Sequence, residues 1–439
     1  MEPILLLIIF GIFILIIISY SKSSLDFVAI SLLGCFIAAT ITFLIIPGID
    51  INTFIVSIEW PAIITILSMS LITKIAQDSN ILEYVSVKLF KVSKGDQRIF
   101  FWLLCIITTL LAAIISDVVV VLILAPIVIR LCHFLRIRAG TYLLGMTICI
   151  NIGSIITPFS SGENIIISTY FINNLHIQLN TLYFIEYFWP FSFFLLFITV
   201  YLIDRFILSK EPKIEEQQKR FVIDLIDSDI MVKNKKMFYF NSIAIIITIA
   251  LFAILPLLYL TAAISALLLV LINRKFNKKP MSELLKDIEW EIIFFFISLY
   301  VVIECLIQAG FNDIFTGIPF EIFNPIILSL IILLIVSFVS GIVANTPTAL
   351  IFNQIIGTLI LTFNFSAAPL LFAFIIGINL GGNIIPQGAA CDMMTLKIAQ
   401  DSGVDNLNYK RLLKTGATFA LIHIGFAVIY LTFLALIFS

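Results

Sequence analysis

The chain has 439 residues, of which 61% are hydrophobic and 12% are charged, and its 26 basic and 27 acidic side chains give a net charge of −1. Soluble domains are about 45–50% apolar and about 25% charged, so this composition excludes a water-soluble globular protein. The net charge does not identify a partner. The expected partners are the lipid bilayer and a small solute, and no nucleic acid.

Long apolar runs predict a polytopic all-α membrane protein, because a helix of roughly 17–25 apolar residues spans a bilayer. Two other segments, 99–132 and 325–362, each predict two helices of about 16 residues, too short to cross with ease. We therefore expect two re-entrant hairpins whose tips are buried in protein or line a cavity. The first run lacks a signal-peptide pattern and is expected to be a retained span. The ten predicted spans are 4–20, 25–46, 61–76, 142–172, 182–204, 238–255, 257–272, 290–308, 369–400 and 415–438.

Basic residues are distributed asymmetrically around these spans. With this layout all 26 Lys and Arg residues fall on one side, and the loops on the other side have none. Basic loops stay in the cytoplasm, so we expect a multi-pass protein of the cytoplasmic membrane with both termini outside.

A recurring segment relates the two halves of the chain. The sequence from Asn151 to Asn164 recurs from Asn379 to Asp392, with Gly, Pro and small polar residues inside a long apolar run. Ile58-Glu59-Trp60 likewise recurs as Ile288-Glu289-Trp290, and Asp117 aligns with Asn345. Each half has five crossings, and an odd number inverts the second half. We expect two inverted repeats. The first is 1–205, with a scaffold region at 1–98 and a transport region at 99–205, and the second is 237–439, with a scaffold region at 237–308 and a transport region at 325–439. A cytoplasmic linker, 206–236, joins them.

The recurring segments are expected to interrupt their helices and to form a binding site, as broken helices do in secondary transporters. Pro158 lacks an N–H and breaks the first span, which leaves free carbonyls before the break and a helix N-terminus near Ser160. The N-terminus suits an anion. The carbonyls, with Asn151 and Thr157, suit a cation such as Na⁺. The second break, from Gly381 to Gly388, supplies the same groups from the opposite direction, so the two breaks should meet near the membrane midplane.

Three acidic residues lie at the most irregular points, and each has a structural alternative. Glu163 could serve only to form a capping box with Ser160. Asp392 could serve the helix dipole. Asp117 could be a turn residue bonded locally. Ionisable groups at membrane depth are costly and usually functional, so we expect at least one of the three to act in transport.

The candidate binding residues lie in the hairpin tips and the two breaks. No catalytic residue, resident metal or cofactor is expected; Na⁺ or H⁺ is the expected coupling ion, with possible Na⁺ positions near Asp117, Asn151, Asn345 and Asn379. Glu304 and His423 are weaker candidates for a proton relay, and the six cysteines are interpreted as packing residues. The complete set is Ser116, Asp117, Asn151, Gly153, Thr157, Ser160, Ser161, Glu163, Asn164, Asn345, Thr346, Asn379, Gly381, Gly382, Asn383, Gln387, Gly388 and Asp392.

These segments resemble the ion-transporter superfamily, which includes arsenite permeases, sodium-proton antiporters and the citrate and dicarboxylate carriers. The resemblance is carried by the hairpins, the Thr157-Pro158 break, Ala344-Asn345-Thr346-Pro347 and the run Gly377 to Asp392, GINLGGNIIPQGAACD. It implies a scaffold made of the early spans of each half, a moving unit that holds hairpins and broken helices, and a homodimer. In the sodium-coupled carboxylate carriers of the superfamily, Ser-Asn-Thr lines the sites at each hairpin tip. The second tip here keeps Asn and Thr, whereas the first has Ser116-Asp117-Val118.

The sequence therefore predicts a cation- or proton-coupled secondary transporter of a small anion or oxyanion, with the arsenite permeases as the closest branch, and no enzymatic activity. A sodium-proton antiporter that exchanges at one of the three carboxyl groups is an alternative. A channel or membrane-embedded receptor is another.

Overall fold

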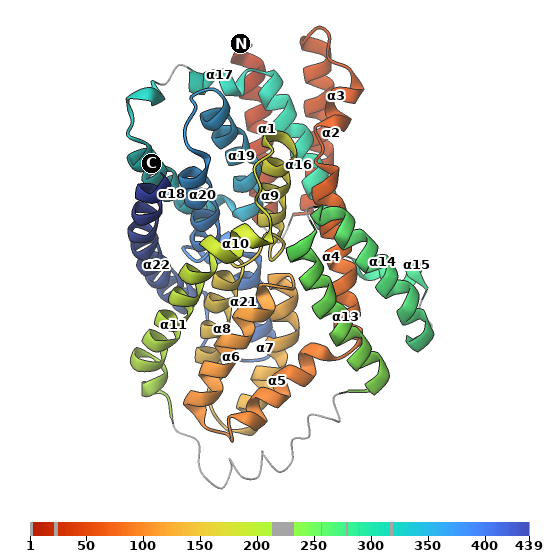
Figure 1. Ribbon diagram of the computed structural model, residues 1–439, viewed down its shortest axis with the longest axis vertical. Helices are drawn as coiled ribbons and strands as arrows, with labels where there is room; N and C mark the ends of the chain where they lie inside the picture. The colour runs from red at the N-terminus through yellow and green to blue at the C-terminus, as the bar shows by residue number, and fades with distance from the viewer. Residues whose placement is uncertain are drawn as a thin grey trace.

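The computed structural model describes residues 3–21, 25–212, 232–255, 257–277, 280–288, 290–316 and 319–438, and within them all regular secondary structure is helical (Figure 1). Ten of these helices are long and apolar enough to cross a membrane. They are α1 (Pro3–Ser21), α2 (Phe27–Ile45), α4 (Trp60–Asp78), α7 (Asp117–Phe134), α11 (Trp189–Phe206), α13 (Lys235–Ile254), α14 (Leu258–Asn277), α16 (Trp290–Gln308), α18 (Pro325–Val343) and α22 (Tyr409–Phe438).

Shorter helices complete the fold. Among them, α5 lies across one end of the molecule in Figure 1. The shorter α-helices are α3 (Ile51–Val56), α5 (Ile81–Val92), α6 (Gln97–Ala112), α8 (Gly140–Gly153), α9 (Gly162–Leu175), α10 (Thr181–Tyr187), α15 (Met281–Leu284), α17 (Phe311–Thr316), α19 (Asn345–Leu361), α20 (Ala367–Gly381) and α21 (Ala390–Asp401), and the 3₁₀ turns are η1 (Leu208–Lys210), η3 (Leu285–Asp287), η4 (Phe320–Ile322) and η5 (Pro386–Gly388).

Both recurring segments interrupt their helices, as the sequence predicts. In the first, α8 ends at Gly153 and α9 begins at Gly162. In the second, α20 ends at Gly381, and only the short turn η5 precedes α21. Because each piece has 12 to 15 residues, none reaches the length of a full span.

Two predictions about helix lengths are wrong. Both α7 and α18 are long enough to cross a membrane alone, so helix length does not by itself define the hairpins. The hairpins are instead defined by their tips, the short turn 113–116 between α6 and α7 and the single residue Ala344 between α18 and α19. The predicted span 182–204 is divided, because α11 begins only at Trp189, where Pro190 favours a helix start, and α10 precedes it.

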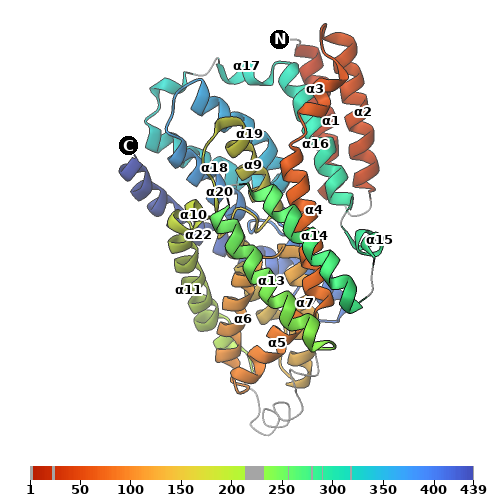
Figure 2. The ribbon, with the colours of Figure 1, turned by 45° about the vertical axis from the view of Figure 1, so that its right-hand side comes forward.

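One group of helices combines the early spans of both halves. Here α4 packs on α14 and α2 packs on α16, so each pair takes one helix from each half (Figure 2). Trp60 and Trp290 also repeat one local structure, since each indole N–H donates to a carbonyl five residues earlier, Ile55 and Leu285 respectively. Glu289, the middle residue of the second recurring motif, lies outside the described residues, as do 213–231 of the linker.

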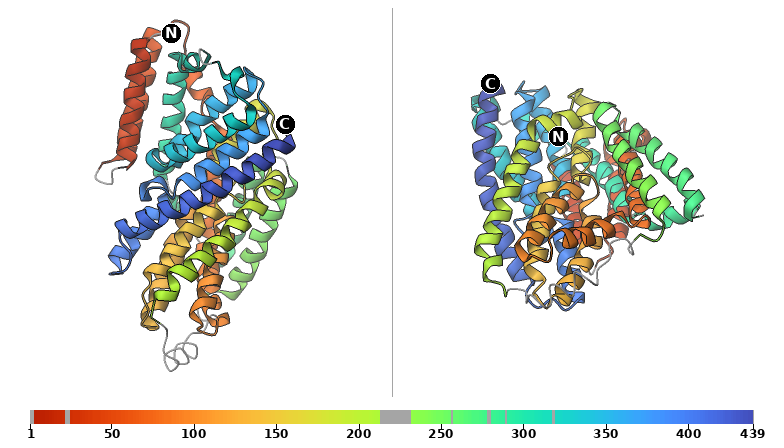
Figure 3. Two further views of the ribbon diagram at one scale, coloured as in Figure 1. Left: turned by 90° about the vertical axis from the view of Figure 1, so that its left-hand side faces the viewer. Right: turned by 60° about the horizontal axis from the view of Figure 1, so that its bottom comes forward.

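A second group holds the hairpins and the interrupted helices. The first arm of each hairpin lies along the first piece of an interrupted helix, α6 on α8 and α18 on α20. The long helix α22 crosses this group obliquely and contacts α18, α20, α8 and α11 (Figure 3). These contacts place both breaks beside the hairpin tips.

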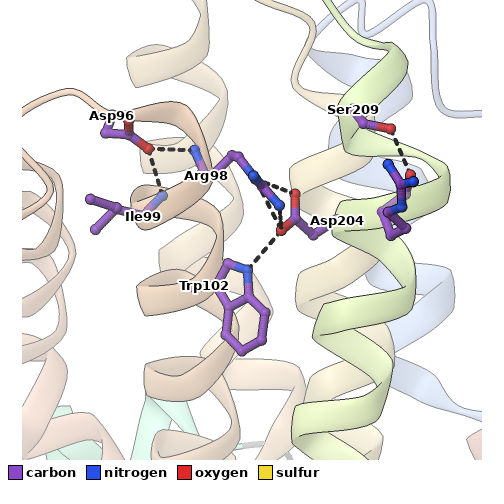
Figure 4. Close-up of polar contacts among 7 residues, drawn as sticks. Asp96, Arg98, Ile99, Trp102, Asp204 and Ser209 are labelled. Atoms are coloured by element: carbon purple, nitrogen blue, oxygen red, sulfur yellow. Dashed lines mark hydrogen bonds and ion pairs between the residues drawn. The ribbon is translucent and has the colours of Figure 1, made fainter.

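An ion pair fixes the start of the first hairpin. Arg98 of α6 donates to Asp204 of α11 through Nε at 2.9 Å and Nη2 at 2.6 Å, and the Trp102 indole donates to the same carboxylate at 3.1 Å (Figure 4). The Asp204 side chain is only 4% exposed, whereas that of Arg98 is 69% exposed. The pair joins the α6 end of the hairpin to α11.

Candidate functional site

The first break satisfies its own freed carbonyls. Ser160 Oγ donates to the carbonyls of Ser154 at 2.6 Å and Thr157 at 2.8 Å. Asn164 Nδ2 donates to the same two carbonyls at 2.6 and 3.0 Å. Ser161, not Ser160, caps α9, since its Oγ accepts from the amide of Asn164. The alternative that assigned the cap to Ser160 is therefore wrong in its cap residue, and two of the predicted cation-binding carbonyls already have protein donors.

Each hairpin closes on a break through backbone contact. Thr157 Oγ1 donates to the Ala113 carbonyl at the first tip at 2.6 Å. Ser340 Oγ of the second hairpin donates to the Ile378 carbonyl of α20 at 2.8 Å. At both sites a glycine allows the approach, because a Cβ at Gly153 would lie 2.5 Å from the Thr109 carbonyl oxygen, and one at Gly381 would lie 2.3 Å from that of Ser337.

The remaining glycines of the second break also lie against a hairpin. A Cβ at Gly382 would lie 3.2 Å from Asn345 Oδ1, and one at Gly388 would lie 3.0 Å from the Gly341 carbonyl oxygen. Thr346 is half-buried in the first turn of α19, directly after Asn345. The second tip is thus packed closely over the second break.

Five buried amides join the two halves of the chain. Asn345 Nδ2 donates to Glu163 Oε1 at 2.8 Å, and Asn379 Nδ2 donates to Asn164 Oδ1 at 2.9 Å. Asn151 Nδ2 donates to Asn383 Oδ1 at 2.8 Å and reaches Asp392. Glu163, Asn345, Asn151, Asn164, Asn379, Asn383 and Asp392 are all 9% exposed or less. The segments from the two recurring sequences therefore meet as expected.

The three acidic residues have different surroundings. Asp392 Oδ1 accepts from Thr147 Oγ1 at 2.6 Å and Asn151 Nδ2 at 3.3 Å, so its side chain bonds to α8 instead of serving only its own helix. Glu163 bonds across to the second hairpin, as described above. Asp117 bonds locally, as its structural alternative predicts, since Oδ1 accepts from the Val118 amide at 2.8 Å and from Ser116 Oγ at 3.4 Å.

The three acidic side chains form a junction that is negatively charged when they are ionised. Asp117 interacts electrostatically with both Glu163 and Asp392. Within the portion of the chain that the structure describes, none of the three carboxyl groups forms an ion pair with Lys, Arg or His. An anion that entered this junction would therefore need a bound cation, a proton or helix N-termini to offset repulsion.

Some predicted residues are turned toward other partners. Gln387 Oε1 accepts from the Tyr409 hydroxyl of α22 at 2.8 Å, whereas Thr157 bonds to the first hairpin. Glu304 accepts from Gln308 in its own helix, and His423 Nε2 lies 2.7 Å from Thr199 Oγ1. Apart from the Thr157 carbonyl, which accepts from Asn164, these residues lie outside the amide network that joins the halves.

Sequence reasoning missed two residues of the junction. Thr147 lies four residues before Asn151, on the same face of α8, and this spacing is a signal that could have found it. Cys391 was interpreted as a packing residue, yet its Sγ donates to Asn151 Oδ1 at 3.1 Å. The signal that could have found Cys391 is its position, because it aligns with Glu163 in the recurring segment.

Comparison with known proteins agrees with this architecture. A family described as "Citrate transporter" matches residues 5–377. An uncharacterized transporter of Mycobacterium bovis is 22% identical over 378 residues, covering 85% of this chain and 86% of the relative. Another, from Methanocaldococcus jannaschii, is 23% identical over 375 residues, covering 85% and 89%.

Two solved structures share the fold. The YdaH transporter of Alcanivorax borkumensis superposes with a TM-score of 0.62 at 9% identity and covers 92% of this chain and 97% of its own. MtrF of Neisseria gonorrhoeae, described as belonging to a class of antimetabolite efflux pumps, gives a TM-score of 0.57 at 11% identity, covering 87% and 82%. At these identities the likeness concerns the fold alone.

Proposed function

The chain belongs to the citrate transporter family, and we propose that it is a cation- or proton-coupled secondary transporter that carries a small anion, with carboxylates as the favoured class. Membership makes it a multi-pass membrane transporter of the ion-transporter superfamily and not an enzyme. The family's description supports a carboxylate cargo, whereas an inorganic oxyanion of the arsenite type rests only on the sequence resemblance.

The observation that carries the coupled mechanism is the charge of the junction. Asp117, Glu163 and Asp392 gather where the two breaks meet, and no basic side chain pairs with them among the described residues. A low-dielectric site of this kind repels an anion unless protons or cations bind with it. Coupling to H⁺ or Na⁺ follows from that requirement.

The proposal includes an inverted-repeat architecture with the domain boundaries given above. In the two recurring segments, Asn151 corresponds to Asn379 and Asn164 corresponds to Asp392. The support for the repeat is that Asn151 pairs with Asp392, and Asn379 pairs in the same way with Asn164. Two repeats related by a two-fold axis in the membrane plane would produce this pattern. We also propose that the basic side is cytoplasmic, that both termini face outward, that the hairpin-bearing group moves against the scaffold, and that two chains form a homodimer.

The experiment is uptake by the purified full-length chain in proteoliposomes. Labelled citrate is presented with a pH gradient and a Na⁺ gradient imposed separately, and counterflow is measured with both gradients collapsed. The proposal expects saturable counterflow and acceleration of uptake by at least one gradient. Flux that is linear in citrate concentration and indifferent to both gradients would indicate a pore and contradict it.

A sodium-proton antiporter is the second candidate, favoured by the same three carboxyl groups. It predicts that a Na⁺ gradient alone moves protons, seen as dequenching of a pH-sensitive dye without any anion present. If dequenching instead requires citrate, the carrier function is favoured.

A further inference from the structure

Two of the amides that join the halves each keep one polar atom without a hydrogen-bond partner among the described residues. These atoms are Asn379 Oδ1 and Asn383 Nδ2, and both side chains are 1% exposed. Buried polar atoms in folded proteins are nearly always paired, because leaving one unpaired forfeits its hydration. Each atom therefore indicates a partner from outside the protein chain.

The unpaired atom of Asn383 is fixed as a donor. Asp392 Oδ1 accepts from Thr147 Oγ1 at 2.6 Å, so it also faces Asn151 as an acceptor, and Asn151 presents its Nδ2 to it at 3.3 Å. The same Nδ2 faces Asn383 at 2.8 Å, which requires Asn383 to present its oxygen. Cys391 Sγ, donating to Asn151 Oδ1, agrees with this orientation. The amide orientation of Asn383 is thus set through Asn151 by a neighbouring acceptor, and its NH₂ group is left over.

The unpaired atom of Asn379 is fixed as an acceptor by the same reasoning. The carbonyls of Ser154 and Thr157 can only accept, so Asn164 directs its Nδ2 to them. Its Oδ1 then faces Asn379, which must present Nδ2, at 2.9 Å. The Asn379 Nδ2 also donates to the Ile375 carbonyl at 2.8 Å. The oxygen of Asn379 is left over.

The two leftover atoms have opposite polarity, and their residues are four positions apart in the chain, Asn379 in the last turn of α20 and Asn383 just beyond its end. An oxygen of a carboxylate matches the Asn383 donor, and a hydroxyl group matches the Asn379 acceptor. Resting on the proposed carboxylate function, we propose that this pair recognises a hydroxycarboxylate: Asn383 Nδ2 donates to a carboxylate oxygen, and Asn379 Oδ1 accepts from a hydroxyl of the same cargo.

This assignment makes Asn379 the residue that determines specificity. A cargo without the hydroxyl would leave the Asn379 oxygen unpaired in the occupied site, and sites built to bond a hydroxyl reject such analogues strongly. Asn383, by contrast, would bind any carboxylate. The two residues should therefore affect affinity in different ways.

The test uses citrate and tricarballylate, which carries the same three carboxylates without the hydroxyl. Each unlabelled acid competes with labelled citrate for uptake into proteoliposomes that contain the full-length chain. Tricarballylate should compete about 10- to 100-fold less well than citrate against the wild type. In Asn379→Leu the two acids should compete within about 2-fold of each other. In Asn383→Leu both should weaken together, by about 10-fold, with the ratio kept.

Asn353→Leu is the matched control. Its Oδ1 also has no hydrogen-bond partner among the described residues, and its side chain is also 1% exposed. It lies on α19, two turns beyond the tip residue Asn345, and is not part of the amide network. It should leave the citrate to tricarballylate ratio unchanged, and size-exclusion profiles of all three variants should match the wild type.

Three outcomes count against the proposal. Equal competition by the two acids in the wild type overturns it. Discrimination that survives in Asn379→Leu assigns that oxygen to a water or a cation and overturns it as well. A wild type that counterflows neither acid while moving other solutes contradicts the carboxylate function itself, and that result is distinguishable from the other two.

Discussion

Replacing Gly381 by alanine tests whether the second hairpin closes on the second break by direct backbone contact. The added Cβ would lie 2.3 Å from the Ser337 carbonyl oxygen and 2.8 and 2.9 Å from that residue's Cα and carbonyl carbon. All three are backbone atoms, so no change of rotamer relieves the contact. Real Cβ atoms essentially never approach within 3.0 Å, so α18 and α20 must separate by about 0.7 Å.

Overpacking of this kind costs about 1–3 kcal/mol. The midpoint of thermal unfolding in detergent should fall by about 2–6 °C. Transport should fall more than stability, about 10-fold or more, because shifts of this size misplace binding groups. Gly425→Ala in α22 is the control, since its Cβ meets nothing within 4 Å and the change should stabilise by about 0.5–1 kcal/mol. If Gly381→Ala were as stable and as active as Gly425→Ala, the hairpin and the break would not be packed as described.

Asp117→Asn should alter the pH or Na⁺ dependence of uptake more than the unfolding midpoint, because an asparagine oxygen can still accept from the Val118 amide and Ser116 Oγ; an unchanged dependence would remove Asp117 from coupling. Ala344→Gly should raise the unfolding midpoint, because Ala344 has φ +84° and ψ 158°, a region that costs a residue with a Cβ about 1–3 kcal/mol; a lower midpoint would refute that strain. Arg98→Met should destabilise by about 1–3 kcal/mol, more than Asp204→Asn, because it leaves the buried carboxylate with Trp102 as its one side-chain donor among the described residues; equal midpoints for the two variants would contradict this reasoning.

Helix positions and helix breaks could be predicted because they depend on local chemistry. Apolar runs of membrane length identify most of the spans, and Pro158 and Pro386, with their neighbouring glycines, mark the two interruptions. The recurrence of Asn151 at Asn379 also predicted that the two segments meet. These features depend on neighbours along the chain, and a sequence displays them directly.

Side-chain pairing across the halves could not be predicted, because it depends on helix rotation and register. The sequence predicted that the carbonyls freed at the break bind a cation, yet the Asn164 side-chain amide donates to two of them. It gave Thr157 and Gln387 as candidate binding residues, yet their side chains bond to the first hairpin and to Tyr409 respectively. The neighbours of Cys391 in the sequence are those of a packing cysteine, and only the fold shows that its Sγ donates to Asn151. Hairpin arm lengths were misjudged because α7 and α18 run further than their apolar pattern suggested.

The central claim is that the cargo binds where the two interrupted helices meet. A cryo-electron microscopy map of the full-length chain in lipid nanodiscs with saturating citrate, compared with a citrate-free map, tests it most directly. The account predicts added density bounded by Asn345 at the second tip, Asp117 at the first and Asn383 in the second break. Added density elsewhere, or two maps that agree throughout this junction under conditions where citrate is transported, would contradict it.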